Sequence, residues 1–283
     1  SLIGEYSAKI SSIVKSASAA TGVVLAHTEY IGGGVIPLAL ALEEAGFTRA
    51  GGARSLFAES PSPRSGFAYA VITGDQSLSP DNPREIKLAT DPGNVNGEKV
   101  KVIIISQAGA EGLDLKFIRQ GHVMEPWYNL SRIEQIIGRA VRTCSHRDLP
   151  FIQRNVQIFL YASLLPDPEI EAADLYVYRQ AEARAMRIGA ASRVLKEASV
   201  DCLLNLEQMG FTVEEMDQVV PQTLGNGASI EYAVGDRPFT AACDYMESCK
   251  YKCRPVGSLE EAMGGQPPTL DTFGEGGLVL NSE

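Results

Sequence analysis

Short apolar runs alternate with stretches of helical periodicity along residues 1–165, and this alternation restricts the possible fold more than any other feature. The runs are continuous rather than alternately polar, as expected for strands that are buried on both faces. They lie at 22–27, 68–72, 100–106, 121–124 and 155–161. Helical periodicity precedes or separates them at 5–19, 35–45, 83–89 and 130–142, and a loop rich in Gly, Ser and Pro is expected at 48–66. The sequence therefore predicts an α/β fold, a parallel sheet with helices on both faces.

Three smaller parts are expected after the sheet domain at 1–165. An apolar stripe at steps of three and four predicts a helical extension over 166–220, broken near Gly189. Residues 221–256 lack periodicity and form a small cysteine-containing segment, and residues 257–283, acidic and rich in Gly and Pro, are expected to be disordered. Because the chain opens with Ser1 rather than Met, we expect it to be the end portion of a longer polypeptide.

The composition excludes several classes of protein. No window approaches the roughly 18 uninterrupted apolar residues that a membrane span needs, so no membrane partner is expected. The N-terminal region also lacks the pattern of a secretory signal. The chain has five cysteines, and an odd count favours reduced thiols in a cytosol-like compartment. Cys243, Cys249 and Cys253 lie close together, but zinc wants four ligands and no C-x-x-C pair is present, so a metal site is the less favoured alternative.

The net charge of −10 argues against a nucleic-acid partner, but the charge is unevenly distributed. Residues 101–160 contain eight basic and five acidic residues, which gives this region a local net charge of +3. A basic face on an acidic protein is therefore possible.

A row of polar and basic side chains follows one face of the helix expected at 130–142. Arg132, Gln135, Arg139 and Arg142 are separated by steps of three, four and three, whereas the intervening positions are mostly apolar. A basic face that is simply solvated would normally have Glu or Lys between its arginines. Several guanidinium groups on one rigid face suit a polyphosphate, because each planar fork can bind two oxygens and stays charged.

A loop with two glycines follows the strand at 100–106. Gly109 and Gly112 permit close approach of the backbone to a ligand, and Asp114 closes the loop. Taken alone this pattern is weak, since Asp114 could equally cap a helix.

Together these segments resemble a known family. The loop 106–114 resembles motif V, and residues 135–142 (QIIGRAVR) resemble motif VI, of superfamily 2 helicases and related nucleic-acid-dependent ATPases. The strand ending at His27 is similar to motif IV, and the strand ending in the Thr73–Gly74 pair, with Arg84 beyond it, is similar to the next part of the second RecA-like domain of these enzymes. Residues 124–135 and 201–205 are most similar to helicase-like ATPases of nucleocytoplasmic large DNA viruses, relatives of the poxvirus early transcription factor small subunit and nucleoside triphosphatase I.

The resemblance implies a role for each matching residue. Arg139 and Arg142 would stabilise charge on the transferred γ-phosphoryl group of ATP, and Gln135 would line the same cleft. Gly112 and Asp114 would lie near the nucleotide ribose and the interdomain contact. Thr28, Gly74, Ser106 and Gln107 would face the backbone of DNA or RNA. The resemblance further implies a role in viral transcription, with a viral transcription complex as partner, in the host cytoplasm or viral factory or packaged in the virion.

The sequence contains no G-x-x-x-x-G-K-[ST] motif and no Asp-Glu pair after an apolar strand, so ATP and Mg²⁺ would be held mainly by a first RecA-like domain absent from this sequence. We expect the isolated chain to be inactive. A non-catalytic module that binds nucleic acid or a transcription complex is the main alternative, and a dinucleotide-binding oxidoreductase is poorly supported. Trp127 is expected to form a core or cleft wall rather than a base-stacking platform, and the three histidines are expected to be structural.

Overall fold

The computed structural model describes residues 2–59, 63–107, 113–167, 170–199, 201–202, 218–235 and 237–254. The chain divides into two compact units. The first unit comprises residues 1–181 and 221–232, and the second comprises residues 182–220 and 233–283. Gly112 and the tail expected at 257–283 lie outside the described residues.

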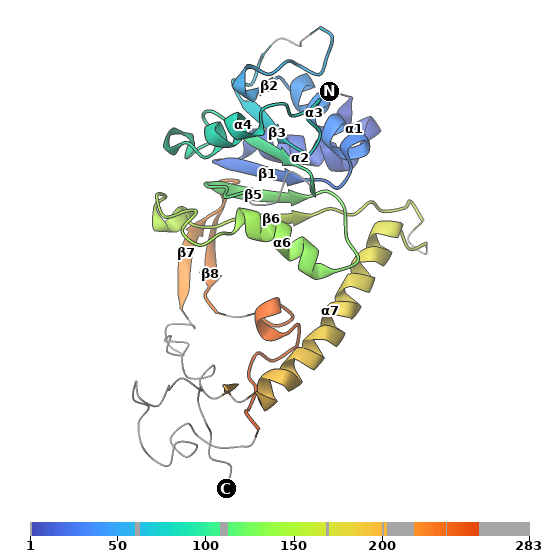
Figure 1. Ribbon diagram of the computed structural model, residues 1–283, viewed down its shortest axis with the longest axis vertical. Helices are drawn as coiled ribbons and strands as arrows, with labels where there is room; N and C mark the ends of the chain where they lie inside the picture. Colours follow the sequence, from blue (N-terminus) through green and yellow to red (C-terminus); the bar gives the residue numbers. More distant parts are fainter. Residues whose placement is uncertain are drawn as a thin grey trace. The chain divides into compact units, whose positions relative to one another are not determined.

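A six-stranded sheet forms the centre of the first unit (Figure 1). Its strands are β1 (Val23–His27), β2 (Thr48–Arg49), β3 (Ala68–Ile72), β4 (Val102–Ile105), β5 (Ile118–Val123) and β6 (Gln157–Leu160). They lie in the order β2-β3-β4-β1-β5-β6, and every neighbouring pair is parallel. The predicted parallel α/β fold is therefore confirmed.

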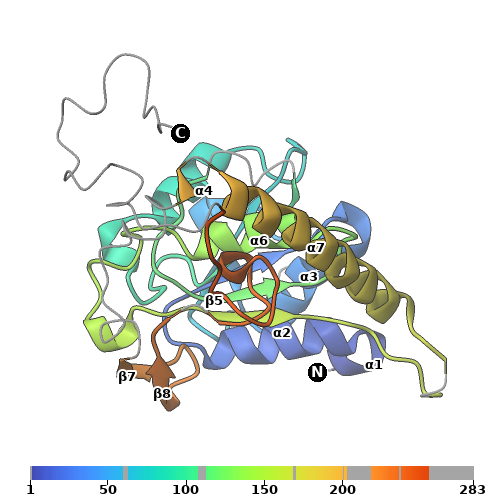
Figure 2. The ribbon, with the colours of Figure 1, turned by 90° about the horizontal axis from the view of Figure 1, so that it is seen from below.

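Helices cover both faces of this sheet because its central strands bury alternate side chains on opposite sides. One face packs Val24 and Ala26 against α2 (Ala8–Ala19) and α3 (Ile36–Glu44). On the other face, Val23 and Leu25 belong to a second core that includes residues near α4 (Asn82–Ala89) and α6 (Leu130–Ala140). Figure 2 shows α2 and α6 on opposite sides of the sheet. Because β3, β4 and β1 are neighbouring parallel strands, their carboxyl ends lie along the same end of the sheet.

Several elements differ from the sequence prediction. The first helix is divided at Ser7 into α1 (Ile3–Tyr6) and α2, because the Ser7 hydroxyl accepts a hydrogen bond from the Ile10 amide and starts a new helix there. The short strand β2 lies inside the expected loop at 48–66. The helix α7 (Ala173–Ala198) runs through Gly189 without the expected break, since one glycine costs a helix only about 1 kcal/mol.

A two-stranded sheet also follows α7, where the sequence shows no periodicity. Its strands are β7 (Val219–Thr223) and β8 (Ser229–Ala233). The turn between them contacts the six-stranded sheet within the first unit: the Gly225 carbonyl accepts a 2.6 Å hydrogen bond from the Thr21 amide. The Thr223 carbonyl accepts a second hydrogen bond from Arg119, a β5 residue that is only 3% exposed.

In the second unit, Arg193 on α7 organises the cysteine-containing segment. Its buried guanidinium pairs with Asp244 at 2.8 Å and also donates to the carbonyls of Cys243, Ser248 and Lys250. Gly189 lies against the same segment, because a side chain there would overlap the Asp244 carbonyl.

The cysteines correct one sequence expectation. Disulfide bonds join Cys202 to Cys253 and Cys243 to Cys249, and only Cys144 is a free thiol among the described residues. The expectation of reduced thiols is therefore wrong for these four, since an odd count does not reveal which cysteines the fold brings together. The described part of the chain contains no cluster of three or more His, Cys, Asp or Glu that could hold a metal ion. It also contains no helix long and apolar enough to span a bilayer.

Candidate functional site

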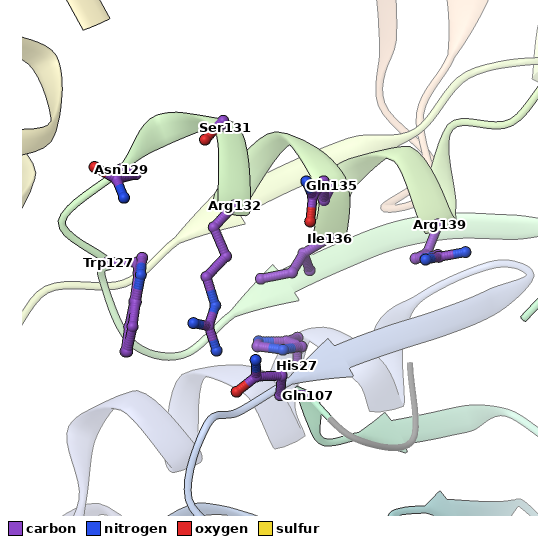
Figure 3. A pocket seen from close by; sticks show the side chains of 9 residues that line it. All are labelled: His27, Gln107, Trp127, Asn129, Ser131, Arg132, Gln135, Ile136 and Arg139. Carbon is purple, nitrogen blue, oxygen red and sulfur yellow. The ribbon is translucent and has the colours of Figure 1, made fainter. Parts of the chain in front are cut away.

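A cavity of about 290 Å³ lies between α6 and the carboxyl ends of β1 and β4 (Figure 3). The helix contributes Ser131, Arg132, Gln135, Ile136 and Arg139. The loop before it contributes Trp127 and Asn129, and the strand ends contribute His27 and Gln107. Ligands of open parallel sheets bind at this edge of the strands, so the cavity is where the fold predicts a site.

The helix α6 presents its polar face to the cavity because its apolar face is fixed by the sheet. Ile133 and Ala140 are buried, and Ala140 lies against Gly121 of β5. The predicted row along the helix is partly observed: its first three members line one cavity, whereas Arg142 lies beyond the end of the helix at Ala140 and outside that lining.

Arg132 is not free to bind a ligand. Its guanidinium forms two hydrogen bonds with the Glu29 carboxylate, at 3.1 and 2.6 Å, and stacks 3.8 Å from the centre of the Trp127 ring. The Glu29 side chain is 7% exposed and that of Arg132 is 21% exposed. This cluster, Glu29, Arg132 and Trp127, joins the loop after β1 to the start of α6.

Arg139 and Arg142 both approach the loop that resembles motif V. Arg142 donates a 2.8 Å hydrogen bond to the Leu113 carbonyl and lies 3.5 Å from the Asp114 carboxylate. Its side chain is 45% exposed and that of Asp114 is 65% exposed, so this ion pair is weak. Arg139 donates a longer hydrogen bond of 3.5 Å to the same carbonyl and has no ion pair within the described ranges. The two predicted motifs therefore contact each other.

Two buried polar atoms beside the cavity have no hydrogen-bond partner among the described residues: Nδ1 of His27 and Oγ of Ser106. His27 is 2% exposed and Ser106 is 4% exposed. Burial, and to a lesser extent the nearby Arg132 charge, lowers the pKa of His27 to about 4, so its imidazole is neutral at physiological pH.

The four residues expected to face nucleic acid follow three adjacent strands at one edge of the sheet, but their exposure differs. Gly74 and Gln107 are exposed. Thr28 is fully buried, and its hydroxyl donates to Glu125 at 2.9 Å. A structural role therefore accounts for the Thr28 side chain, which does not reach the surface. The Ser106 side chain is buried as well.

Sequence reasoning missed Glu29 and Glu125, which hold this end of the site together. Glu125 accepts hydrogen bonds from the Thr28 hydroxyl and the Glu29 amide, and burial raises its pKa. One sequence signal could have indicated them: Glu29 and Glu125 each come just after an apolar strand, β1 or β5, and these two strands are neighbours in the sheet. A carboxylate that is buried there needs a hydrogen-bonding or charged partner.

Proteins of large DNA viruses share sequence with the chain. It is 44% identical over 130 residues to protein R350 of Acanthamoeba polyphaga mimivirus, named as an ATP-dependent RNA helicase, an alignment that covers 44% of this chain and 16% of that protein. It is 30% identical over 230 residues to protein 087L of Invertebrate iridescent virus 3, named as a helicase, with coverage of 78% and 20%. It is 32% identical over 149 residues to an African swine fever virus protein named as a termination factor NPH-I homolog, with coverage of 49% and 21%.

Residues 55–144 also match the model of the helicase conserved C-terminal domain. Among solved structures, the C-terminal part of the Fun30 ATPase domain aligns with 56% of this chain at 14% sequence identity, with a TM-score of 0.38. The chain spans 16%, 20% and 21% of the lengths of the three viral relatives, in the order in which they are named above.

Proposed function

Because the chain carries a helicase conserved C-terminal domain and is related to helicases of large DNA viruses, we propose that it is the second RecA-like half of a nucleic-acid-dependent ATPase. In this proposal, a first RecA-like domain binds ATP and the present chain supplies arginines across the cleft between the two. The relative named as a termination factor homolog supports a role in viral transcription, in the host cytoplasm or viral factory.

The position and the charge of Arg139 support this proposal most directly. It lines the cavity beside Gln135, and the part of the chain that the structure describes offers its guanidinium no carboxylate. A guanidinium that pairs with no carboxylate of the described residues, and that lies beside an amide, suits the oxygens of a phosphate group. Arg142 is held nearby by a carbonyl and a weak, exposed ion pair, and exchanging that pair for a phosphate costs little.

The residues of this chain fit the phosphate groups of ATP but not Mg²⁺. The metal prefers several carboxylate or water oxygens, and the described residues gather no such set of acidic groups. We therefore assign Mg²⁺ to the first domain and derive no step through it. Arg139 and Arg142 would bind and orient the γ-phosphate and stabilise the charge that develops on it, while Gln135 lines the same space.

Nucleic acid would bind along the edge of the sheet where Gly74 and Gln107 are exposed. These residues follow the neighbouring strands β3 and β4, so their backbones lie at the same edge. The alternative, a non-catalytic module of the same fold, would use this edge alone and would not need the arginines.

The test is ATP turnover by the full-length polypeptide that contains this chain. Replacing Arg142 with alanine should lower turnover by about three orders of magnitude and leave ATP affinity nearly unchanged, as for loss of an arginine finger. Arg147 is a matched control, because it is an exposed arginine whose one ion pair among the described residues is with its neighbour Asp148. Equal turnover by native, Arg142→Ala and Arg147→Ala proteins would remove the arginines from the mechanism and favour the module.

A further inference from the structure

The start of α6 is held by a side chain from another part of the sheet rather than by a cap of its own. Asn129, the residue before the helix, makes no capping hydrogen bond with its side chain among the described residues. Instead Arg132, in the first turn, donates two hydrogen bonds to the Glu29 carboxylate, at 3.1 and 2.6 Å, and stacks on Trp127. A guanidinium–carboxylate pair with two bonds is directional, whereas apolar contacts are not. The Glu29–Arg132 pair therefore fixes how α6 is rotated about its own axis.

Glu29 is itself tied to the sheet. Its amide donates a 3.1 Å hydrogen bond to Glu125, which comes just after the neighbouring strand β5, and the hydroxyl of the buried Thr28 donates to the same carboxylate at 2.9 Å. Gly34 lets the loop close on Thr28, since a Cβ at position 34 would lie 1.8 Å from the Thr28 hydroxyl oxygen. With its backbone fixed in this way and its side chain only 7% exposed, Glu29 can hold Arg132 in one place.

The rotation of α6 decides where its polar row points. Arg132, Gln135 and Arg139 lie on one face of the helix and all line the cavity (Figure 3). Side chains reach about 5–6 Å from the axis of a helix, so a rotation of about 10° displaces their ends by about 1 Å. A misplacement of about 1 Å can slow a reaction by about 100-fold. An anchor on the first member of the row thus controls the position of the others.

We propose that Glu29 is a positioning residue for ATP turnover: by holding Arg132 it sets the rotation of α6 and directs Arg139 at the γ-phosphate of ATP. The inference rests on the proposed function, because Arg139 meets a phosphate only if the first domain binds ATP. Glu29 itself touches no ligand, since Arg132 occupies its carboxylate. The first arginine of the row is then an anchor and not a phosphate ligand.

The test compares ATP turnover by the full-length polypeptide in its native form and as Glu29→Gln, Arg139→Gln and the double variant. Glu29→Gln keeps the size of the side chain but removes the charge that holds Arg132. Glu43→Gln is the control for lost stability. The Glu43 carboxylate is also buried, at 2% exposure, but its hydrogen-bond partners among the described residues lie in the loop after β2 and in β3, not in α6. Circular dichroism shows that each form is folded at the assay temperature.

We expect Glu29→Gln to lower the maximal turnover rate by about 10- to 100-fold and to change the KM for ATP by less than about 3-fold, because the first domain still binds the nucleotide. Glu43→Gln should turn over ATP as the native protein does. The double variant should lose far less than the product of the two single losses, since an arginine that is absent can no longer be misdirected.

Three results would overturn the positioning role: native turnover by Glu29→Gln, an equal loss in Glu43→Gln, or losses that multiply in the double variant. If Glu29→Gln does not fold, Arg132→Lys replaces it, because lysine keeps the charge pair but not the two-bond geometry. Native turnover by that variant would overturn the role as well.

The same measurements separate this inference from the proposed function. Native turnover by both Arg139→Gln and Arg142→Ala would reject the proposed function, and the positioning role with it. Impaired turnover by these arginine variants, together with native turnover by Glu29→Gln, would reject the positioning role alone.

Discussion

Removing either charge of the Glu29–Arg132 pair should destabilise the first unit far more than removing an equally well-formed surface pair. The carboxylate is 7% exposed and accepts two hydrogen bonds, so Glu29→Gln or Arg132→Gln leaves a largely buried charge without its partner. Loss of one partner of a fully buried pair costs about 3–5 kcal/mol. Because Arg132 keeps 21% exposure and its contact with Trp127, we expect about 2–4 kcal/mol for each variant and a coupling energy of about 2 kcal/mol.

The assay is a double-mutant cycle by urea unfolding, followed by the fluorescence of Trp127. The control is the Glu171–Arg179 pair, which has the same two-bond geometry, at 2.8 and 2.7 Å, but side chains that are 40% and 60% exposed. Its coupling should be indistinguishable from zero, because water screens exposed pairs. A coupling below about 0.5 kcal/mol for Glu29–Arg132, or equal couplings for both pairs, would refute the reasoning that burial determines the strength.

Two further predictions concern stability. Burial lowers the pKa of His27 and of His122 from 6.5 to about 4, so acidification protonates the unfolded chain first and stability falls. As the pH falls from 6.5 to 5, each histidine should lower the free energy of unfolding, measured with urea, by up to about 2 kcal/mol. His122→Gln should make this free energy depend less steeply on pH. A free energy of unfolding that rises on acidification would contradict the prediction. Gly189→Ala should lower the thermal unfolding temperature, because its side chain would overlap the Asp244 backbone. Gly138→Ala should instead stabilise α6 by about 1 kcal/mol in calorimetry, because a Cβ at this position would have no atom of the described residues within 4 Å apart from the backbone of its own helix. A loss of stability would contradict this expectation.

The sheet was predictable because its strands carry their own signal. Runs such as Val102–Ile105 are apolar throughout, and a strand that is buried on both faces typically consists of consecutive apolar residues. The strands that were missed carry no such signal. The strand β2 has only two residues, and β8 is exposed along its length, so neither needs an apolar run.

The candidate site was predictable as a set of segments but not as a set of contacts. The spacing of Arg132, Gln135 and Arg139 placed them on one face, because helical periodicity alone determines this. It could not show that Arg132 is engaged by Glu29, a residue 103 positions earlier in the chain. The burial of Thr28 was hidden for the same reason, since its partner Glu125 lies at the end of a neighbouring strand. Pairings between strand ends depend on the order of strands in the sheet.

The anchoring of the β7–β8 turn affects where the chain can be shortened. Arg119 is buried in the sheet and gives one of its hydrogen bonds to Thr223, and Thr21 gives another to Gly225. A fragment ending at residue 165, where the alternation of strands and helices stops, would lose both acceptors and leave a buried guanidinium short of a partner. The compact unit that holds this sheet and satisfies its hydrogen bonds is discontinuous in sequence, so a fragment for expression should extend past Tyr232 or carry the turn on a short artificial linker.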